Sequence, residues 1–363
     1  MSNIFDYMEW RDIDIKKVEF NEIDNLILSR ISYFPLDNLI EEEESIKLKD
    51  IYNRLPDKDN VERYLQKEDK DFFRILANSK RFGEIKLTNF ENNVDEIKEK
   101  QFSVVTIILP DNSIYISYRG TDNTIVGWKE DFNMSFQDLV PSQIEAVNYL
   151  EKVANRYRTR KIIIGGHSKG GNLAVYAAVF CNEKYKKRIK AVYNNDGPGF
   201  QEKVIKSKEY KEIVSKVHTY RPQTSIIGKL LNHKEKCITV KSTETGIMQH
   251  DLYSWQVLGD KFIRTEPTNV SDVIDKTITN WLKDVEPEQR GQFIDILFDI
   301  LNKTDAKTLH EMGNNWFNSS KTILMEYKNI DDQSKEIISK TLSSLFSAAK
   351  GNIKIRRPKF KKN

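Results

Sequence analysis

The hydrophobic pattern divides the chain at about residue 270. Between residues 102 and 241, short runs of β-branched and aromatic residues alternate with stretches of helical periodicity. Strands are predicted at 102–109, 114–118, 161–165, 190–194, 214–220 and 237–241, and helices at 142–158 and 172–185. This alternation predicts an α/β fold with a mostly parallel central sheet and helices on both faces. The first two strands form a hairpin, which adds an antiparallel edge.

The first hundred residues are predicted to be mainly helical. Apolar residues at helical spacing predict an amphipathic helix over 20–34, and a second helix is expected within 60–80. We interpret the acidic run Glu41 to Glu44 as a solvated segment or a helix start, not as a metal site.

From about Ser271 the pattern becomes helical throughout, with helices expected at 271–285, 287–302, 306–328 and 332–349. The sequence therefore predicts an α/β domain at 1–270, a helical appendage at 271–350 and a basic tail at 351–363. The last helix carries an apolar stripe of Ile337, Ile338, Leu342, Leu345 and Phe346. We expect this stripe to pack against the α/β body, with a lid or a membrane-surface contact as the alternative.

The composition is that of a soluble, folded chain. Hydrophobic residues make up 39% and charged residues 31% of the sequence, and a chain of this length can bury a sizeable core without disulfides. Cys181 and Cys237 lie far apart, with no second Cys or His at metal-ligand spacing. We interpret both as thiols in or near the core of a protein in a reducing compartment, and we expect neither metal nor cofactor.

The net charge of +4 is concentrated at the C-terminal end of the sequence. The segment 351–363 holds six basic residues and no acid, so the rest of the chain carries −2. We interpret the tail as a solvated end, with attraction to an anionic membrane surface as the alternative. Only Phe360 lies among these charges, so no nucleic-acid partner is expected. The first residues lack the apolar segment of a signal peptide and no run of 18 apolar residues occurs, so a cytoplasmic location is expected.

The run Ile162 to Gly171 carries the strongest chemical signal. A short apolar strand precedes, and a helix follows, the five residues Gly166-His167-Ser168-Lys169-Gly170, which match G-x-S-x-G, the nucleophile elbow of α/β hydrolases. In this context the hydroxyl of Ser168 projects at the top of the sheet. The amide of Lys169, the first of the helix, points to where an oxyanion would form. A glycine-rich turn in another kind of α/β protein is the alternative.

Chain order selects His250 as the base, because in α/β hydrolases the order is serine, acid, histidine. Of the five histidines, His167 precedes the serine, His218 lies in a predicted strand, His233 in a lysine-rich loop and His310 in the helical appendage. His250 follows the last predicted strand at loop distance. A surface histidine with a structural hydrogen bond is the alternative.

The acid has no candidate in its common place, after the seventh strand. Between residues 214 and 236 there is no Asp, and the only Glu is Glu235, beside lysines. Asp196 ends the preceding strand, where sites form in open α/β sheets, although turn chemistry alone would explain it. Asp251 and Ser225 are the competing candidates, and a serine could orient the histidine only by hydrogen bonding.

A second oxyanion donor is expected from the segment Tyr118-Arg-Gly-Thr-Asp122, which follows an early strand. Gly120 allows the backbone to approach a ligand closely, and Thr121 offers an amide and a hydroxyl. We expect Arg119 to pair with Asp131 and hold this loop. An ordinary turn with a surface ion pair is the alternative.

These motifs resemble those of class 3 lipases: R-G-T at 119–121, W-x-x-D at 128–131 and G-H-S-K-G-G-N-L-A at 166–174. The chain is most similar to an uncharacterised bacterial branch of that superfamily, with which it shares residues 3–11, 20–26, 196–200, 225–228 and 249–251. The resemblance covers about residues 3–260. It implies an α/β-hydrolase fold with Ser168 as nucleophile, His250 as base and Thr121 near the oxyanion. One departure stands out: class 3 lipases carry an aspartate about where this chain has Ser225.

Together these patterns predict a serine hydrolase of esters, similar to lipases and esterases. Ser168 would attack the carbonyl, His250 would move the proton, and water would hydrolyse the acyl-enzyme. A lipid or other acyl ester as substrate follows from the resemblance alone. A catalytically silent hydrolase-fold protein that binds a partner or a membrane surface is the competing hypothesis, and a thioesterase or peptidase is a third.

Overall fold

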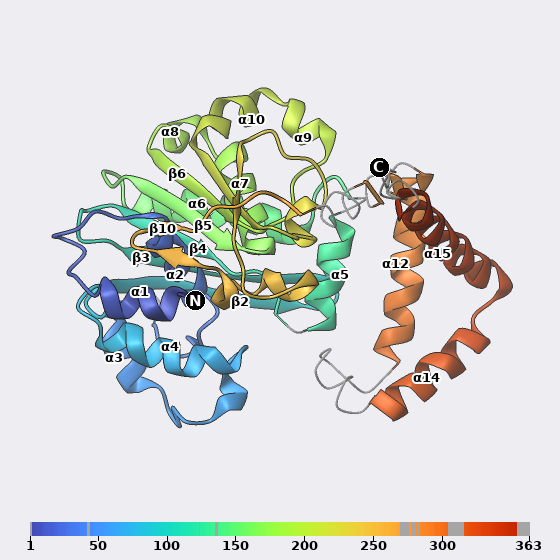
Figure 1. Cartoon of the computed structure of the whole chain (residues 1–363), viewed down its shortest axis with the longest axis horizontal. Helices are drawn as coiled ribbons and strands as arrows, with labels where there is room; N and C mark the ends of the chain where they lie inside the picture. Colours follow the sequence, from blue (N-terminus) through green and yellow to red (C-terminus); the bar gives the residue numbers. More distant parts are fainter. Residues whose placement is uncertain are drawn as a thin grey trace, which may run out of the picture.

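The computed structural model describes residues 2–41, 44–122, 124–134, 137–268, 276–277, 280–281, 284–303 and 316–353. At its centre lies an eight-stranded sheet in which the strands follow one another in chain order, from β1 to β8 (Figure 1). The strands are β1 (Ser45–Lys47), β2 (Lys86–Asp95), β3 (Lys100–Ile108), β4 (Ile114–Tyr118), β5 (Ile162–His167), β6 (Ile189–Asn195), β7 (Val217–Pro222) and β8 (Cys237–Val240).

The sheet has an antiparallel and a parallel part. Strands β1 to β4 pair antiparallel, and β4 to β8 pair parallel. The predicted hairpin of β3 and β4 is therefore confirmed, but the antiparallel edge is larger than predicted because β1 and β2 extend it. Strand β2 reads Lys-Leu-Thr-Asn-Phe-Glu-Asn-Asn-Val-Asp, with a register shift between Thr88 and Glu91. Its polar residues and irregular register hide the alternation that marks a strand.

The central strands of the parallel part are buried on both faces, as β5 shows. On β5, Ile163 faces one core, and Ile162 and Ile164 face the other. The first core is covered by α1 (Ile4–Trp10), α2 (Glu22–Ile31), α3 (Leu48–Arg54) and α4 (Lys67–Asn78), and the second by α6 (Pro141–Arg156), α7 (Lys169–Phe180), α9 (Glu202–Lys206) and α10 (Lys208–Ile213). With the strand–turn–helix at Ser168, this is the predicted α/β-hydrolase fold.

Two helix boundaries correct the sequence prediction. The helix predicted at 142–158 is α6, which begins at Pro141 and has Val140 as its N-cap. Proline sets the backbone angle of the first helical position, which explains the earlier start. The helix after the elbow begins at Lys169 and ends at Phe180, and a short separate helix, α8 (Glu183–Lys186), follows.

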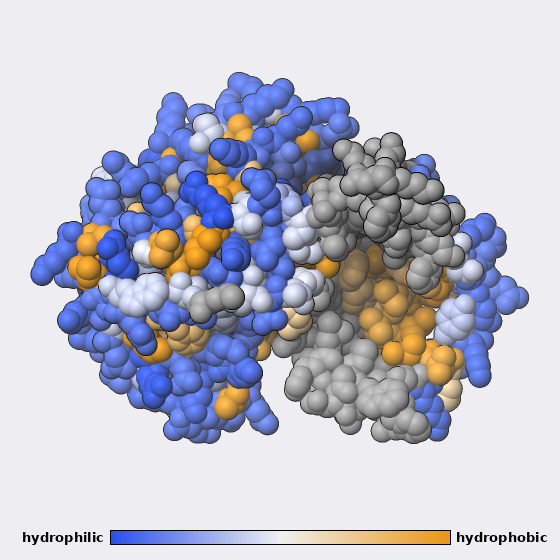
Figure 2. Space-filling view, in the orientation of Figure 1, coloured by the Kyte–Doolittle hydropathy of each residue, from blue (hydrophilic) through white to orange (hydrophobic). Residues whose placement is uncertain are grey.

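The C-terminal helices stand beside α5 (Ile125–Asn133), as Figure 1 shows. They are α12 (Pro287–Asn302), α14 (Trp316–Asn329) and α15 (Asp332–Ile353). The ring of Phe298 on α12 lies 6.0 Å from that of Phe132 on α5, measured between centroids. Hydrophobic residues gather on the surface over α12 (Figure 2).

The apolar stripe of the last helix is only partly described. Ile338 is buried, Leu342 is exposed, and α15 packs on α12, which in turn contacts α5. The side chains of Leu345 and Phe346, most of the predicted helix 271–285, the start of the helix predicted at 306–328 and the tail beyond residue 353 lie outside the described residues. Within the described part of the chain, none of the helices has the length and apolar character needed to cross a membrane.

Two glycines let β5 and α7 meet tightly at the elbow. A Cβ added at Gly166 would lie 2.3 Å from the carbonyl carbon of Gly170, and one added at Gly170 would lie 2.1 Å from the carbonyl oxygen of Tyr118. Both contacts are with backbone, which cannot move aside as a flexible side chain could. The spacing of the motif therefore has a steric cause.

We predict that Gly170→Ala lowers the free energy of unfolding by about 3 kcal/mol or more, because the added methyl overlaps the backbone of β4. Gly259→Ala is the control. Gly259 has φ +64° but no atom within 4 Å of an added Cβ. The unfolding free energy of Gly259→Ala should therefore fall only by the cost of backbone strain, about 1–2 kcal/mol. Urea unfolding of both variants measures the difference, and equal losses would contradict the steric explanation.

Candidate active site

Ser168 occupies a strained turn between β5 and α7. Its backbone has φ 58° and ψ −135°, a region that non-glycine residues rarely adopt. The backbone N–H of Ser168 donates to the carbonyl of Asn195 at the end of β6, over 2.9 Å. As a whole, the residue is of intermediate burial. The predicted turn thus has the strained backbone of a nucleophile elbow.

The two predicted oxyanion residues come from segments that lie against each other. Lys169 is the first residue of α7, so its amide has no partner within the helix. A Cβ added at Gly120 would lie 2.9 Å from Cβ of Ser168 and 2.6 Å from the carbonyl oxygen of His167. The backbone before Thr121 therefore packs directly on the nucleophile turn.

The structure brings His250 and Asp196 together. His250 ends the short 3₁₀ helix η4 (Gly246–His250), and its Nδ1 lies 2.6 Å from Oδ2 of Asp196. Asp196 directly follows β6, has φ 53° and donates its backbone N–H to the carbonyl of Tyr220 on β7. The carboxylate side chain is 1% exposed and the imidazole 24%. With Nδ1 engaged by the carboxylate, Nε2 is the ring nitrogen left for proton transfer. Among the described residues, no hydrogen bond joins Ser168 Oγ to His250.

The two competing candidates for the acid have other partners. Ser225, in the loop after β7, donates its hydroxyl to Oδ1 of Asp196 over 2.5 Å. A Cβ at Gly228 would lie 2.3 Å from the same oxygen, so this loop must carry a glycine there. Asp251 accepts the amide of Tyr253 and caps the 3₁₀ helix η5 (Leu252–Ser254). Burial raises the pKa of Asp251. Ser225 therefore contacts Asp196, a contact that the sequence did not reveal.

The loop that carries Thr121 is held differently from the prediction. Arg119 does not pair with Asp131: its guanidinium lies 3.3 Å from Asp122 and 3.0 Å from the side-chain oxygen of Asn92. Asp131 instead accepts the hydroxyl of Thr121. Burial raises the pKa of Asp131 to about 6, against the opposing influence of the nearby Lys169 charge.

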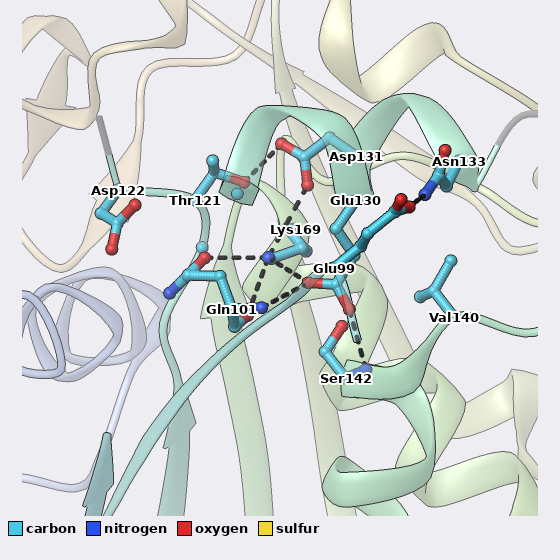
Figure 3. A network of polar contacts seen from close by, with 12 residues as sticks. Glu99, Gln101, Thr121, Asp122, Glu130, Asp131, Asn133, Val140, Ser142 and Lys169 are labelled. Atoms are coloured by element: carbon cyan, nitrogen blue, oxygen red, sulfur yellow. Dashed lines mark hydrogen bonds and ion pairs between the residues drawn. The ribbon is translucent and has the colours of Figure 1, made fainter. Parts of the chain in front are cut away.

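The side chain of Lys169 forms a buried polar network behind the elbow (Figure 3). Its Nζ donates to the backbone and side-chain oxygens of Gln101 over 2.9 and 2.8 Å, and to Glu130 over 2.9 Å. Glu130 also accepts the backbone amides of Gln101 and Ser142. The side chain of Lys169 is 1% exposed and that of Glu130 is 0% exposed. This buried network therefore ties α5 and β3 to the turn at Ser168.

The sequence prediction for Lys169 concerned only its backbone amide. The buried ion pair of its side chain could have been predicted from two features: the lysine lies between an apolar strand and an apolar helix, and two consecutive acids occur at Glu130 and Asp131.

One group of potential metal ligands occurs among the described residues, and it corrects the expectation that no histidine lies at ligand spacing from Cys237. Ligand atoms of His233, Glu235 and Cys237 lie within 4.8 Å of one another. The carboxylate of Glu235 already accepts hydrogen bonds from His233, Thr219 and Tyr210. Burial alone would raise the pKa of Glu235, but these donors and the neighbouring His233 hold it below its usual value. We therefore interpret the group as a satisfied structural cluster.

Comparison with known proteins gives a family match and distant structural similarities. A family model described as Mbeg1-like matches residues 76–299, more than half of the chain. The chain is similar to the Rhizomucor miehei lipase propeptide complex (14% identity, TM-score 0.34, 46% of this chain and 67% of that one). It is also similar to lipase II from Rhizopus niveus (15% identity, TM-score 0.34, 44% of this chain and 67% of that one). A third similarity is to a fungal lipase (15% identity, TM-score 0.36, 66% of this chain and 84% of that one). Similarity at this level carries no weight for the site. No curated protein matches.

We predict strong coupling between Lys169 and Glu130. Lys169→Met leaves a buried carboxylate without its partner and should cost about 3–5 kcal/mol of unfolding free energy. The double variant Lys169→Met, Glu130→Gln has no orphaned charge and should be more stable than Lys169→Met alone. Urea unfolding of the single and double variants measures the coupling, and additive losses would contradict it.

We predict a pH-dependent stability difference for Asp131→Asn. Between pH 3.8, the ordinary value, and about pH 6, the folded protein keeps a proton on Asp131 that the unfolded chain has lost. The contribution of Asp131 to the unfolding free energy therefore falls as the pH rises through this window. Asparagine does not titrate, so the variant shows no such decrease. Relative to wild type, Asp131→Asn should gain stability from pH 4 to pH 6 and gain no more above pH 7.

Urea unfolding at pH 4, 5, 6 and 7 measures this difference. Asp138→Asn is the control, because that side chain is 66% exposed. A difference between wild type and Asp131→Asn that stays constant across the series would show that the fold does not perturb this carboxyl group.

Proposed function

The chain belongs to the Mbeg1-like family, and we propose that it is a serine hydrolase that cleaves carboxylic esters through an acyl-enzyme. The observation that carries this proposal is the 2.6 Å hydrogen bond between His250 Nδ1 and Asp196 Oδ2, beside the strained turn at Ser168. A serine in such a turn, a histidine and a buried carboxylate are the three groups that acyl transfer by a serine nucleophile requires.

The proposed reaction begins with Ser168 Oγ attacking the ester carbonyl carbon while His250 Nε2 takes the hydroxyl proton. The carbonyl π electrons move to oxygen, and the resulting oxyanion receives hydrogen bonds from the amides of Lys169 and Thr121. Protonated His250 then gives its proton to the leaving alkoxide as the tetrahedral intermediate collapses. Water, deprotonated by His250, attacks the acyl-enzyme and releases the acid.

Asp196 stabilises the imidazolium that forms in both halves of this reaction. Its carboxylate holds His250 in the tautomer with the proton on Nδ1, which leaves Nε2 to accept the serine proton. The hydroxyl of Ser225 occupies the other carboxylate oxygen, so the acid is fixed in one orientation. This support from Ser225 is part of the proposal.

We extend the proposal to lipid or other acyl esters as substrates. The support is the resemblance of residues 119–121, 128–131 and 166–174 to the motifs of class 3 lipases. A catalytically silent hydrolase-fold protein remains an outcome of the test below. The missing acid after β7 favours a silent protein, whereas the contact between Asp196 and His250 favours an enzyme.

We expect the purified protein to react with a fluorophosphonate probe and to hydrolyse short p-nitrophenyl esters, and Ser168→Ala to lose both. Asp196→Asn should lower kcat by about 10³–10⁴, because the wrong tautomer of His250 is then favoured. Ser225→Ala should lower it only about tenfold, since a single hydrogen bond to the acid is lost.

Ser113→Ala is the control, because Ser113 is a buried serine in the β3–β4 turn, before the first residue of β4, whereas Thr121 follows the last residue of that strand. Labelling of wild type no stronger than that of Ser168→Ala would support the silent protein. Full activity of Asp196→Asn would remove Asp196 from the site and leave the serine hydrolase proposal standing without its acid.

A further inference from the structure

We propose that Tyr33, from the N-terminal segment of the chain, is a positioning residue whose hydroxyl joins the oxyanion loop to the nucleophile elbow and, through His167, to the base. The oxyanion loop is here the segment Tyr118–Asp122. This proposal rests on the hydrolase function proposed above.

The hydroxyl of Tyr33 lies between two of the segments that build the site. It accepts the backbone N–H of Gly120 over 2.9 Å, and it donates towards the carbonyl oxygen of His167 at 3.1 Å. Nδ1 of His167 lies 3.3 Å away. One buried oxygen atom therefore contacts both the loop that carries Thr121 and the residue directly before Ser168.

His167 extends this connection to the base. Its Nε2 lies 2.8 Å from the backbone carbonyl oxygen of His250, and the two imidazole rings lie 4.5 Å apart between centroids. Burial lowers the pKa of His167 well below its usual value, so the ring is neutral and carries one proton. A carbonyl can only accept, so that proton is on Nε2. Nδ1 carries no proton and lies beside the hydroxyl of Tyr33, whose single proton goes to the carbonyl oxygen of His167.

Tyr33 is itself held rigidly by the N-terminal helices. The guanidinium of Arg30, at the end of α2, lies 4.5 Å from the centroid of the Tyr33 ring. Arg30 is bound by both oxygens of Asp69 on α4, over 2.6 and 2.5 Å, and Tyr253 donates to the same carboxylate. Burial raises the pKa of Tyr33 to about 12, so its hydroxyl keeps the proton that it donates.

This arrangement places an essential support outside the range that the family model matches. Residues 76–299 include Gly120, His167 and His250 but not Tyr33. The peptide that Tyr33 holds, at Gly120, directly precedes Thr121. Because a misplacement of about 1 Å at a catalytic group can cost about 10²-fold in rate, loss of this anchor should affect the chemical step more than substrate binding.

Tyr33→Phe removes the hydroxyl and keeps the ring over Arg30. We expect kcat for p-nitrophenyl esters to fall at least about tenfold, with KM changed less than twofold. The matched control is Tyr149→Phe: Tyr149 is a buried tyrosine whose hydroxyl bonds to Asn89 and Thr106, outside the site. It should lose similar stability in thermal unfolding but keep its kcat. Equal changes in kcat for the two variants would overturn the positioning role.

Amide hydrogen exchange tests the inference independently of activity. The Gly120 amide should be protected in the wild type, exchange at least about tenfold faster in Tyr33→Phe and remain protected in Tyr149→Phe. An unprotected Gly120 in the wild type, or unchanged exchange in Tyr33→Phe, would overturn the proposal. If the wild type hydrolyses esters no faster than Ser168→Ala, the hydrolase function fails, while the exchange result still decides whether Tyr33 holds the loop.

Discussion

The left-handed backbone at Ser168 is the constraint on which the rest of the site depends. A non-glycine residue in such a conformation costs of order 1–3 kcal/mol and persists only where its surroundings determine it. Here Gly166 and Gly170 bring β5, α7 and the end of β4 into backbone contact, and the amide of Ser168 is held by Asn195. Because the turn has one geometry, the first amide of α7 and the Cα–Cβ bond of Ser168 have fixed directions, and the other groups of the proposed site are arranged around them.

Two buried polar links connect this turn to segments far away in the chain, and a third lies beside it. Lys169 reaches Glu130 on α5, and Tyr33 reaches Gly120 and the residue before the serine. Beside the turn, the carboxylate of Asp196 is shared between Ser225 and His250. Buried polar groups are costly unless they are paired, so each link favours one arrangement of its loops. Donors that are already oriented need not reorganise when charge develops, which is what stabilisation of an oxyanion requires.

The sequence predicts those features that are local. The runs at β3 to β6 and at β8 are short and mainly apolar, and the position of the serine between strand and helix follows from its own neighbours. Strand β7 begins at Val217, three residues later than predicted, because residues 214–216 form a 3₁₀ turn. Strand β2 was missed because its asparagines and its register shift remove the alternation. Arg119 was assigned the wrong acid because two carboxylates, Asp122 and Asp131, lie within reach along the chain, and only the fold shows that Thr121 occupies the second. No sequence pattern indicates the role proposed for Tyr33, since the hydrogen-bond partners of its hydroxyl come from segments more than 80 residues away.

The position of the acid follows from the geometry of a parallel sheet. Neighbouring parallel strands end at the same edge and lie about 4.8 Å apart, so a carboxylate after β6 and a side chain after β7 can reach the same histidine. Here the short hydroxyl of Ser225 follows β7 and the longer carboxylate of Asp196 follows β6, and the two are hydrogen-bonded to each other. In the proposed site the acid therefore follows β6, and the position after β7 holds the serine that hydrogen-bonds to it. A carboxylate that is 1% exposed, bonded to His250 and fixed by a second donor, meets the physical requirements of the third residue, whichever strand carries it.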